Sequence, residues 1–405
     1  MDIQHVILFF TGMLLISIVV QPIVSKSGFP LAAGLILAGY LMSEVLVYYS
    51  IDTGIRWDNF RDLVFYVFFP ILIYEAAFNM NARLLFKNLL PVLFLSVPMM
   101  LVSTLGIAVV LYYGIGHPEG FPWVAALLTG ALLSATDPAA VLGIFRKMNI
   151  SKRLSLLVEG ESLFNDAAAI VLYSMLLGIA LMSDADINMG DESLGFLKVF
   201  AGGLLVGLFV GGMGYLLIPV IRDVTSRGVL SLVSAYLSYF IAESGLHVSG
   251  VMAVLVAGLV LGQASRADAN QDTHRFMASL WQYKSYIANS MVFLISGITI
   301  QLAMFTDQWY AILIGIAAAT LARAAAIFGM FPLVNIIPGI ESVGYKQQLL
   351  IYWGGVRGAV TLALALSLPT DLPYWWTIQS VAYGFVIFTL IVQAPTMSIL
   401  LKHAE

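Results

Sequence analysis

Two acidic side chains stand in apolar sequence where a membrane-spanning helix would not be expected to carry a charge. Asp137 lies in Thr136-Asp137-Pro138, and Asp166 ends the segment 159–166, which reads EGESLFND. A charge near mid-bilayer costs about 3 kcal/mol on insertion scales, so such a residue survives where it faces a partner or a water-filled path. Carboxylate, hydroxyl and carbonyl oxygens are ligands for hard cations, and a carboxylate also binds protons. These acids therefore predict a site for a small cation, a proton or both.

The residues around Asp166 fall on two faces of a helix. Ser162 and Asp166 are four positions apart and share one face, while Glu161 and Asn165 share the neighbouring face. One pair can thus line a cavity while the other reaches toward a different helix.

The composition requires a membrane to bury most of the chain. Of its 405 residues, 60% are hydrophobic and only 10% are charged, whereas soluble domains carry about 25% charged residues. We expect an all-α polytopic membrane protein with a single transmembrane domain over residues 1–405. The net charge of −4 argues against nucleic acid as a partner, and the absence of cysteine excludes disulfides and thiolate metal sites.

Runs of about 20 apolar residues are long enough to span a bilayer, and thirteen such segments can be counted. They are 4–25, 29–48, 62–80, 88–113, 121–145, 153–182, 194–221, 228–243, 246–264, 273–301, 308–336, 345–368 and 374–401. The first has no basic residue before it, unlike a signal peptide, and we expect it to be retained.

The basic residues predict the orientation, because cytoplasmic loops are enriched in Lys and Arg. With the N-terminus outside and the C-terminus cytoplasmic, the outer loops hold only Arg56 and Arg61. The inner loops and tail then hold Lys26, Arg83, Lys87, Arg146, Lys147, Lys152, Arg153, Arg222, Arg227, Arg266, Arg275, Lys346 and Lys402.

Two of the thirteen segments are expected to be broken. In 121–145, Pro138 removes a backbone donor and pushes Asp137 away from helical angles. In 345–368, the stretch 354–358 (GGVRG) holds three glycines. These segments lie seven places apart in the order, as expected if two six-helix repeats of opposite topology surround a transport site.

The predicted spans hold more acid than base. The acids are Glu75, Asp137, Glu161 and Asp166, and the bases are Arg323, Arg357 and, counted generously, Lys284. The surplus of one or two negative charges favours binding of one small cation or proton. If Asp166 binds either ligand but never both, the two exchange.

Three motifs together resemble those of the NhaP/NHE branch of the cation/proton antiporters: 136–138 (TDP), 159–166 and 354–360 (GGVRGAV). The resemblance covers nearly the whole chain. It implies an antiporter, not an enzyme, that exchanges Na⁺ (or Li⁺) for H⁺ by alternating access, electroneutrally and one for one. It also implies pH homeostasis in a prokaryotic cell membrane, with no cofactor beyond these substrates.

The resemblance further implies a homodimer embedded in lipid. The unwound parts of 121–145 and 345–368 would cross in a core bundle that includes 62–182 and 273–368. The remaining helices would form the dimer interface. Many relatives carry a long cytosolic tail, whereas this sequence ends at Glu405, so we expect that regulation through such a tail is either absent or belongs to a segment outside this sequence.

Site roles follow from the same resemblance. Asp166 corresponds to the ion-binding, proton-carrying aspartate; Asp137, Ser162 and the Thr136 carbonyl correspond to further Na⁺ ligands; and Glu75 corresponds to an acid close to the site. Glu75 could also be an interfacial acid.

Two further positions concern charge. Asn165 occupies the place of a second aspartate, which goes with electroneutral exchange, although an asparagine can also hydrogen-bond across helices without an ion. Glu161 corresponds to a glutamate paired with a core arginine, either Arg323 or Arg357, and we favour Arg357.

Other functions fit the sequence less well. K⁺/H⁺ antiport stays open, because oxygen ligands serve both ions. A cation channel lacks a visible ring of filter residues. An intramembrane aspartyl protease would need Tyr-Asp and Gly-x-Gly-Asp motifs, and a serine hydrolase Gly-x-Ser-x-Gly; the sequence contains none of these.

Overall fold

The computed structural model describes residues 3–27, 29–49, 61–116, 120–148, 150–181, 189–267, 271–336 and 341–404. Arg56, one of the two basic residues of the predicted outer loops, lies outside them. All regular structure in the described ranges is helical, which confirms the predicted fold class.

Every predicted span corresponds to a helix or to consecutive helices. In chain order the elements are α1 (Ile3–Ser27), α2 (Leu31–Tyr48), the π-helical η1 (Leu63–Phe68) with α4 (Phe69–Asn79), α5 (Ala82–Lys87), α6 (Leu89–Ser96) with α7 (Pro98–Gly114), α8 (Trp123–Ser134) with α9 (Ala139–Lys147), α10 (Lys152–Leu181), α11 (Met189–Leu217), α12 (Val224–Phe240) with η2 (Ile241–Gly245), α13 (Gly250–Ala267), α14 (Gln271–Thr299), α15 (Leu302–Asp307), α16 (Trp309–Asn335), α17 (Tyr345–Trp353) with α18 (Ala359–Leu366), and α19 (Trp375–Phe388) with η3 (Thr389–Gln393) and α20 (Ala394–Ala404).

Ten of these elements are long and apolar enough to cross a membrane, counted over the described residues. The other three predicted spans depart from that pattern for visible reasons. Residues 63–79 are short, α14 carries polar side chains such as Gln282, Lys284 and Asn289 along its length, and 345–366 is broken in the middle. The count of thirteen therefore stays a prediction.

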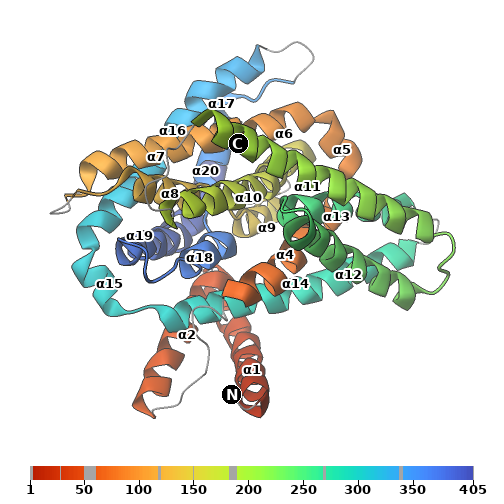
Figure 1. Cartoon of the computed structure of the whole chain (residues 1–405), viewed down its shortest axis with the longest axis horizontal. Coiled ribbons are helices and arrows are strands. Elements are labelled where there is room, and N and C mark those ends of the chain that lie inside the picture. The colour runs from red at the N-terminus through yellow and green to blue at the C-terminus, as the bar shows by residue number, and fades with distance from the viewer. Residues whose placement is uncertain are drawn as a thin grey trace.

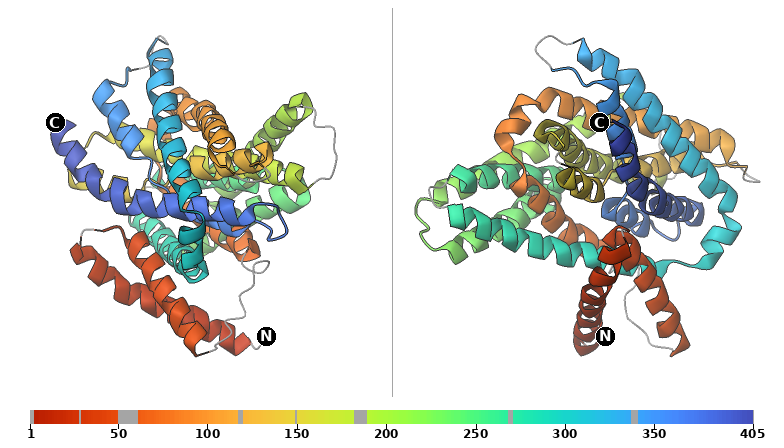
Figure 2. Two further views of the ribbon diagram at one scale, coloured as in Figure 1. Left: turned by 90° about the vertical axis from the view of Figure 1, so that its left-hand side faces the viewer. Right: turned by 180° about the vertical axis from the view of Figure 1, so that it is seen from behind.

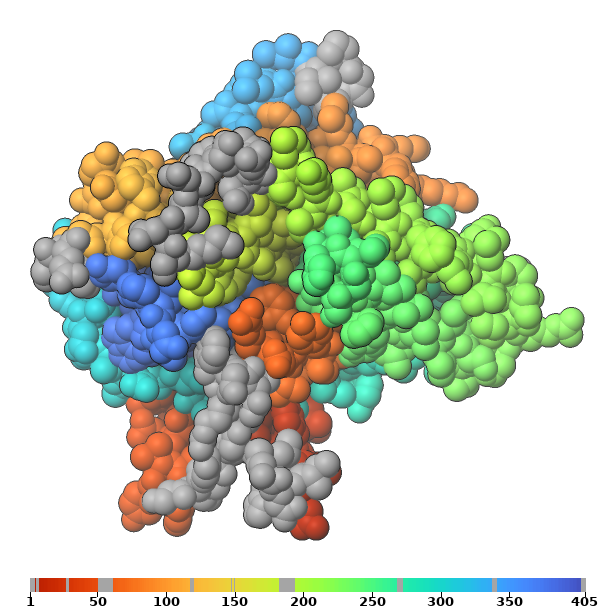
Figure 3. Space-filling model, viewed as in Figure 1, coloured from red at the N-terminus to blue at the C-terminus, as the bar shows by residue number. Residues whose placement is uncertain are grey.

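The helices pack around a central region, and α1 and α2 project from one side of it (Figures 1 and 2). The rest of the molecule forms one closely packed body (Figure 3). α2 is fixed to α14 by a close backbone approach, since a Cβ on Gly39 would collide with the Leu294 carbonyl. α7 packs against both α8 and α16, so the fourth and eleventh predicted spans lie side by side.

Two helices are broken where the sequence predicts it. The chain leaves helical geometry between Ser134 and Ala139, and again between Trp353 and Ala359. The two unwound segments meet, because the Asp137 N–H donates to the Val356 carbonyl at 2.7 Å. The predicted crossing is thus confirmed, and it lies beside α10, which carries Asp166.

The glycines of 354–358 provide space at this crossing. A Cβ on Gly355 would lie 2.5 Å from the guanidinium carbon of Arg323, and a Cβ on Gly358 would lie 2.5 Å from the carboxyl carbon of Asp137. Real Cβ atoms do not approach other atoms so closely. Both glycines are therefore required by the side chains that occupy their empty side.

We predict that Gly358→Ala destabilises the protein, because the new methyl group must displace Asp137 from the crossing. Overpacking of this kind costs about 1–3 kcal/mol. Gly178→Ala is the matched control, because nothing lies within 4 Å of a Cβ there and alanine favours a helix interior by up to about 1 kcal/mol. Thermal unfolding in detergent compares the two variants; equal melting temperatures for Gly358→Ala and wild type would contradict this view of the crossing.

Candidate functional site

A cavity of about 350 Å³ lies next to the crossing. Five of the six predicted ion-binding residues line it: Glu75, Thr136, Asp137, Ser162 and Asp166. They come from α4, from the unwound segment after α8, and from α10. The structure thus brings together residues that are up to 91 positions apart in the sequence. Asn165 is the exception, because it does not line the cavity.

The Asp137 carboxylate lies at the N-termini of two half-helices. Its Oδ1 accepts a hydrogen bond at 2.9 Å from the N–H of Ala139, the first residue of α9. The Ala359 N–H, which opens α18, is also directed at this carboxylate. Because the first N–H groups of a helix lack partners within the helix and carry partial positive charge, Asp137 stabilises both broken helices at once.

The Asp166 carboxylate is left with free acceptor capacity. Its Oδ1 has no hydrogen-bond partner among the described residues, while the Thr136 N–H faces the group. One turn earlier, the Ser162 hydroxyl donates to the Thr136 carbonyl. Since a hydroxyl that donates its proton keeps two acceptor lone pairs, Ser162 presents oxygen to the same cavity.

Asn165 supports the broken end of α8. Its side-chain N–H₂ donates to the Ser134 carbonyl at 2.8 Å and to the Thr136 hydroxyl at 3.3 Å. Ser134 is the last residue of α8, so its carbonyl has no partner within the helix. The structure therefore shows the cross-helix hydrogen bonds that the sequence left open as an alternative to ion binding.

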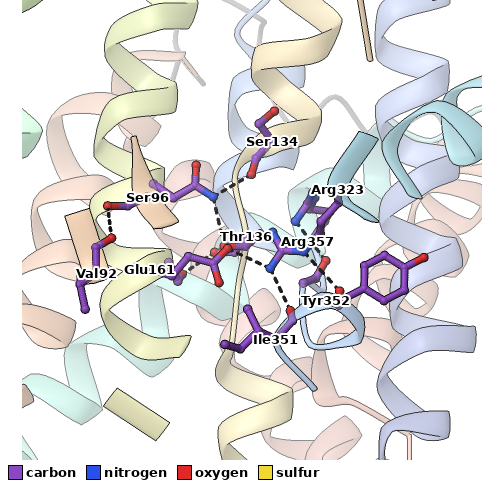
Figure 4. A network of polar contacts seen from close by, with 12 residues as sticks. Val92, Ser96, Ser134, Thr136, Glu161, Arg323, Ile351, Tyr352 and Arg357 are labelled. Atoms are coloured by element: carbon purple, nitrogen blue, oxygen red, sulfur yellow. Dashed lines mark hydrogen bonds and ion pairs between the residues drawn. The ribbon is translucent and has the colours of Figure 1, made fainter. Parts of the chain in front are cut away.

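Glu161 pairs with Arg323, and the preference for Arg357 was wrong. The Arg323 Nη2 lies 2.8 Å from Glu161 Oε1, and both side chains are nearly buried. The same guanidinium donates to the carbonyls of Ile351 and Tyr352 at 3.0 and 3.2 Å. Those carbonyls end α17, so Arg323 balances a carboxylate and the negative end of a helix together (Figure 4).

Arg357 is only 1% exposed but is held in a different way. Its Nη1 donates to the Gly355 carbonyl at 3.0 Å, and its guanidinium lies 5.4 Å from the ring centre of Phe385. Its Nε has no hydrogen-bond partner in the described part of the chain. The charges of Glu161 and Asp166 act on it, so it is a buried cation close to the cavity acids.

Glu75 forms a hydrogen bond within its own helix, α4, at the edge of the cavity. Its carboxylate accepts from the Asn79 side chain at 2.7 Å and lies near the Ser285 hydroxyl.

Lys284, the third base counted within the spans, lies instead over the Trp281 ring, 4.3 Å from its centre, and is not among the cavity-lining residues.

Several polar residues that line the cavity are not predicted as site residues from the sequence. They are Asn79, Arg146, Glu159, Gln282, Ser285, Asn289 and Thr361. Glu159 belongs to the same motif as Asp166, seven positions earlier, and that spacing of two helical turns is a signal that could have placed it on the same face. The others lie in ordinary helical sequence, where nothing marks a cavity.

The donor set of the cavity is rich in oxygen. Among the described residues no group of three or more His, Cys, Asp or Glu side chains is placed to hold a metal ion. A cation here would instead meet carboxylate, hydroxyl and backbone carbonyl oxygens. Such a mixed set suits a weakly held alkali ion better than a tightly bound divalent metal.

We predict that Arg323→Gln lowers stability by about 3–5 kcal/mol, because it leaves Glu161 buried without its counter-charge. Glu161→Gln in the same chain should recover most of that loss. The control is a second double-mutant cycle, in which Glu161→Gln is combined with Arg357→Gln. Thermal or denaturant unfolding gives the coupling energy of each pair. A coupling energy larger for Arg357 than for Arg323 would contradict the observed pairing.

Comparisons with known proteins identify the family and agree with this fold. The chain is 36% identical over 347 residues to the Na(+)/H(+) antiporter ApNhaP of Aphanothece halophytica, covering 84% of this chain and 64% of that protein. It is 34% identical over 352 residues to the Na(+)/H(+) antiporter NhaH of Halobacillus aidingensis, covering 85% and 84%. This chain thus spans less than two thirds of the length of the first relative.

The fold is shared with the sodium proton antiporter MjNhaP1 from Methanocaldococcus jannaschii. The TM-score is 0.82 at 22% sequence identity, covering 99% of this chain and 98% of that chain. Residues 12–403 match the family described as sodium/hydrogen exchanger, transmembrane. Because the match runs over almost the whole sequence, the chain belongs to the sodium/hydrogen exchanger family.

Proposed function

We propose that this integral membrane protein is a secondary active antiporter that exchanges Na⁺ for H⁺ at Asp166. The observation that carries the proposal is the Asp166 carboxylate itself. It lines a polar cavity beside Ser162 and the unwound 135–138 segment, and one of its oxygens has no partner among the described residues. Such an oxygen is free to take a proton or a metal ion, and each ligand excludes the other.

The neighbouring charges leave this role to Asp166. Glu161 is balanced by Arg323 at 2.8 Å, and Asp137 is directed at the N-termini of α9 and α18. Arg357 faces Asp166 without forming a salt bridge of 4 Å or less to any described residue. One monovalent charge is then exchanged at one carboxylate, which supports electroneutral stoichiometry.

The crossing supports transport by alternating access. Two half-helix pairs meet at the cavity, so a rigid-body movement of the bundle that contains them can expose Asp166 to either side without unfolding. The proposal places the core in 62–182 and 273–368 and the homodimer interface in the remaining helices. It also places the protein in the cell membrane of a prokaryote, with its N-terminus outside and its C-terminus in the cytoplasm.

K⁺/H⁺ antiport and a cation channel are weaker alternatives. Relatives over most of this chain are named Na⁺/H⁺ antiporters, which favours Na⁺ over K⁺. The site is built once per chain from side chains on different helices, and it is not a ring of repeated filter oxygens. Proteoliposomes challenged with Na⁺, Li⁺ and K⁺, with and without a membrane potential, separate these functions.

We predict that Asp166→Asn abolishes Na⁺-driven proton movement in proteoliposomes. A side-chain amide does not bind a proton near neutral pH, and it carries no charge to neutralise a cation. The control is Asp223→Asn: Asp223 caps α12 by accepting from the Ser226 N–H at 2.8 Å, away from the cavity, and its loss should leave exchange in place. Proton movement at the wild-type rate in Asp166→Asn would remove the site assignment.

The apparent KM for Na⁺ should depend on pH, because the ligand must be deprotonated to bind a metal ion. At pH values where Asp166 is mostly protonated, the KM for Na⁺ should rise about tenfold for each unit by which the pH is lowered, because protons compete with Na⁺ by mass action. Vmax at saturating Na⁺ should change less. Initial rates over a matrix of pH and Na⁺ concentration measure both. A KM that stays constant from acid to alkaline pH is incompatible with competition at one carboxylate.

A further inference from the structure

Thr361 carries a buried hydroxyl that no protein group satisfies. The residue is 1% exposed, and its Oγ1 has no hydrogen-bond partner in the described part of the chain. Buried hydroxyls are nearly always paired, and an unpaired one costs about 1–3 kcal/mol. This position therefore calls for a partner that the protein alone does not supply.

The missing partner has a structural cause. A threonine inside a helix commonly donates to the carbonyl three or four residues earlier. Buried threonines elsewhere in this protein do so: Thr129 donates to Ala125 at 2.7 Å and Thr389 to Val386 at 2.9 Å. Thr361 is only the third residue of α18, which begins at Ala359, so the carbonyls three and four residues earlier belong to the unwound segment. The first of these, of Gly358, accepts from the Leu362 N–H at 3.3 Å, and neither is a partner of the Thr361 hydroxyl.

The position of Thr361 points to the ion. Thr361 lines the same cavity as Asp137, Ser162 and Asp166. It comes from α18, whereas Ser162 and Asp166 come from α10, so the two helices contribute oxygens from different walls. Gly358, three residues before Thr361, lies against the Asp137 side chain. The start of α18 is therefore next to the proposed ion site.

We propose that the Thr361 hydroxyl oxygen is a ligand of the transported alkali cation, contributed by α18 in addition to the ligands on α10. The proposal rests on the antiport function proposed above and adds a residue to its site. A hydroxyl is a neutral oxygen ligand, so it replaces one water of the ion without changing the number of charges exchanged. Thr361 thus acts on cation affinity and ion selectivity, and the proton count stays with Asp166.

The test compares Thr361→Val, which has nearly the same shape without the hydroxyl, with Thr361→Ser, which keeps it. Thr129→Val is the matched control, because it removes an equally buried hydroxyl that is already satisfied within α8. Each purified variant is reconstituted for Na⁺- and Li⁺-driven proton movement. Each is also heated in detergent with and without Na⁺, which reports binding independently of transport.

Thr361→Val should raise the KM for Na⁺ about tenfold or more, since hydrogen bonds and ligand contacts to charged groups are the strong ones. It should also remove most of the Na⁺-dependent rise in melting temperature and change the Na⁺ to Li⁺ preference. Without Na⁺ it should be as stable as wild type or more stable, because an unsatisfied hydroxyl has been removed. Thr361→Ser should keep the wild-type KM within about threefold.

A purely structural role for Thr361 gives the opposite pattern: lower stability without Na⁺ and an unchanged KM. That result, or wild-type KM and Na⁺ stabilisation in Thr361→Val, overturns the proposal while antiport by the wild-type chain still stands. If wild type and Thr129→Val both move no protons in response to Na⁺, the proposed function itself fails, and the ligand proposal fails with it.

Discussion

The crossing of the two broken helices depends on the carboxylate of Asp137, which interacts with both of them. Two helices are interrupted inside the apolar body of the protein, and each interruption exposes backbone N–H and C=O groups that cost free energy unless they find partners. Asp137 accepts from the start of α9 and faces the start of α18, while its own N–H donates to Val356. Each helix N-terminus carries about half a positive charge, so one carboxylate balances two of them. The other ends are supported by Asn165 at α8 and Arg323 at α17.

This arrangement separates structural charges from the charge that is exchanged. Arg323 is already committed to Glu161 and to the carbonyls that end α17, so it is not available to a cavity acid. Arg357 lies nearer the cavity but donates to backbone and packs on Phe385. Asp166 therefore faces the negative charge of Asp137 and the positive charge of Arg357, and it forms no salt bridge of 4 Å or less with any described residue. A strong salt bridge there would block ion entry, and the absence of any positive charge would hold a cation too tightly to release it.

Much of this could be predicted from the sequence, because the strongest signals are local. Pro138 and the glycines of 354–358 mark the two breaks, and four-residue spacing places Ser162 with Asp166. The choice between two arginines was not local. Arg323 lies within the unbroken α16, and only the missing Cβ of Gly355 lets its side chain reach the end of α17; no pattern in the sequence reveals that route. Thr361 was invisible for a related reason, because its hydroxyl is unpaired only since α18 begins two residues before it.

The division of labour between carboxylates and hydroxyls explains how such a site can be tuned. Each acid that releases a proton when a cation enters changes the number of protons exchanged, and so changes the net charge that is moved. A hydroxyl or a carbonyl adds oxygen to the coordination shell at no cost in charge. In the proposed mechanism the broken helices supply both: the Thr136 carbonyl from the unwound segment after α8 and the Thr361 hydroxyl from the first turn of α18. On that proposal, breaking two helices does more than open a path, because it frees neutral ligands that adjust cation affinity while the exchanged proton stays on Asp166.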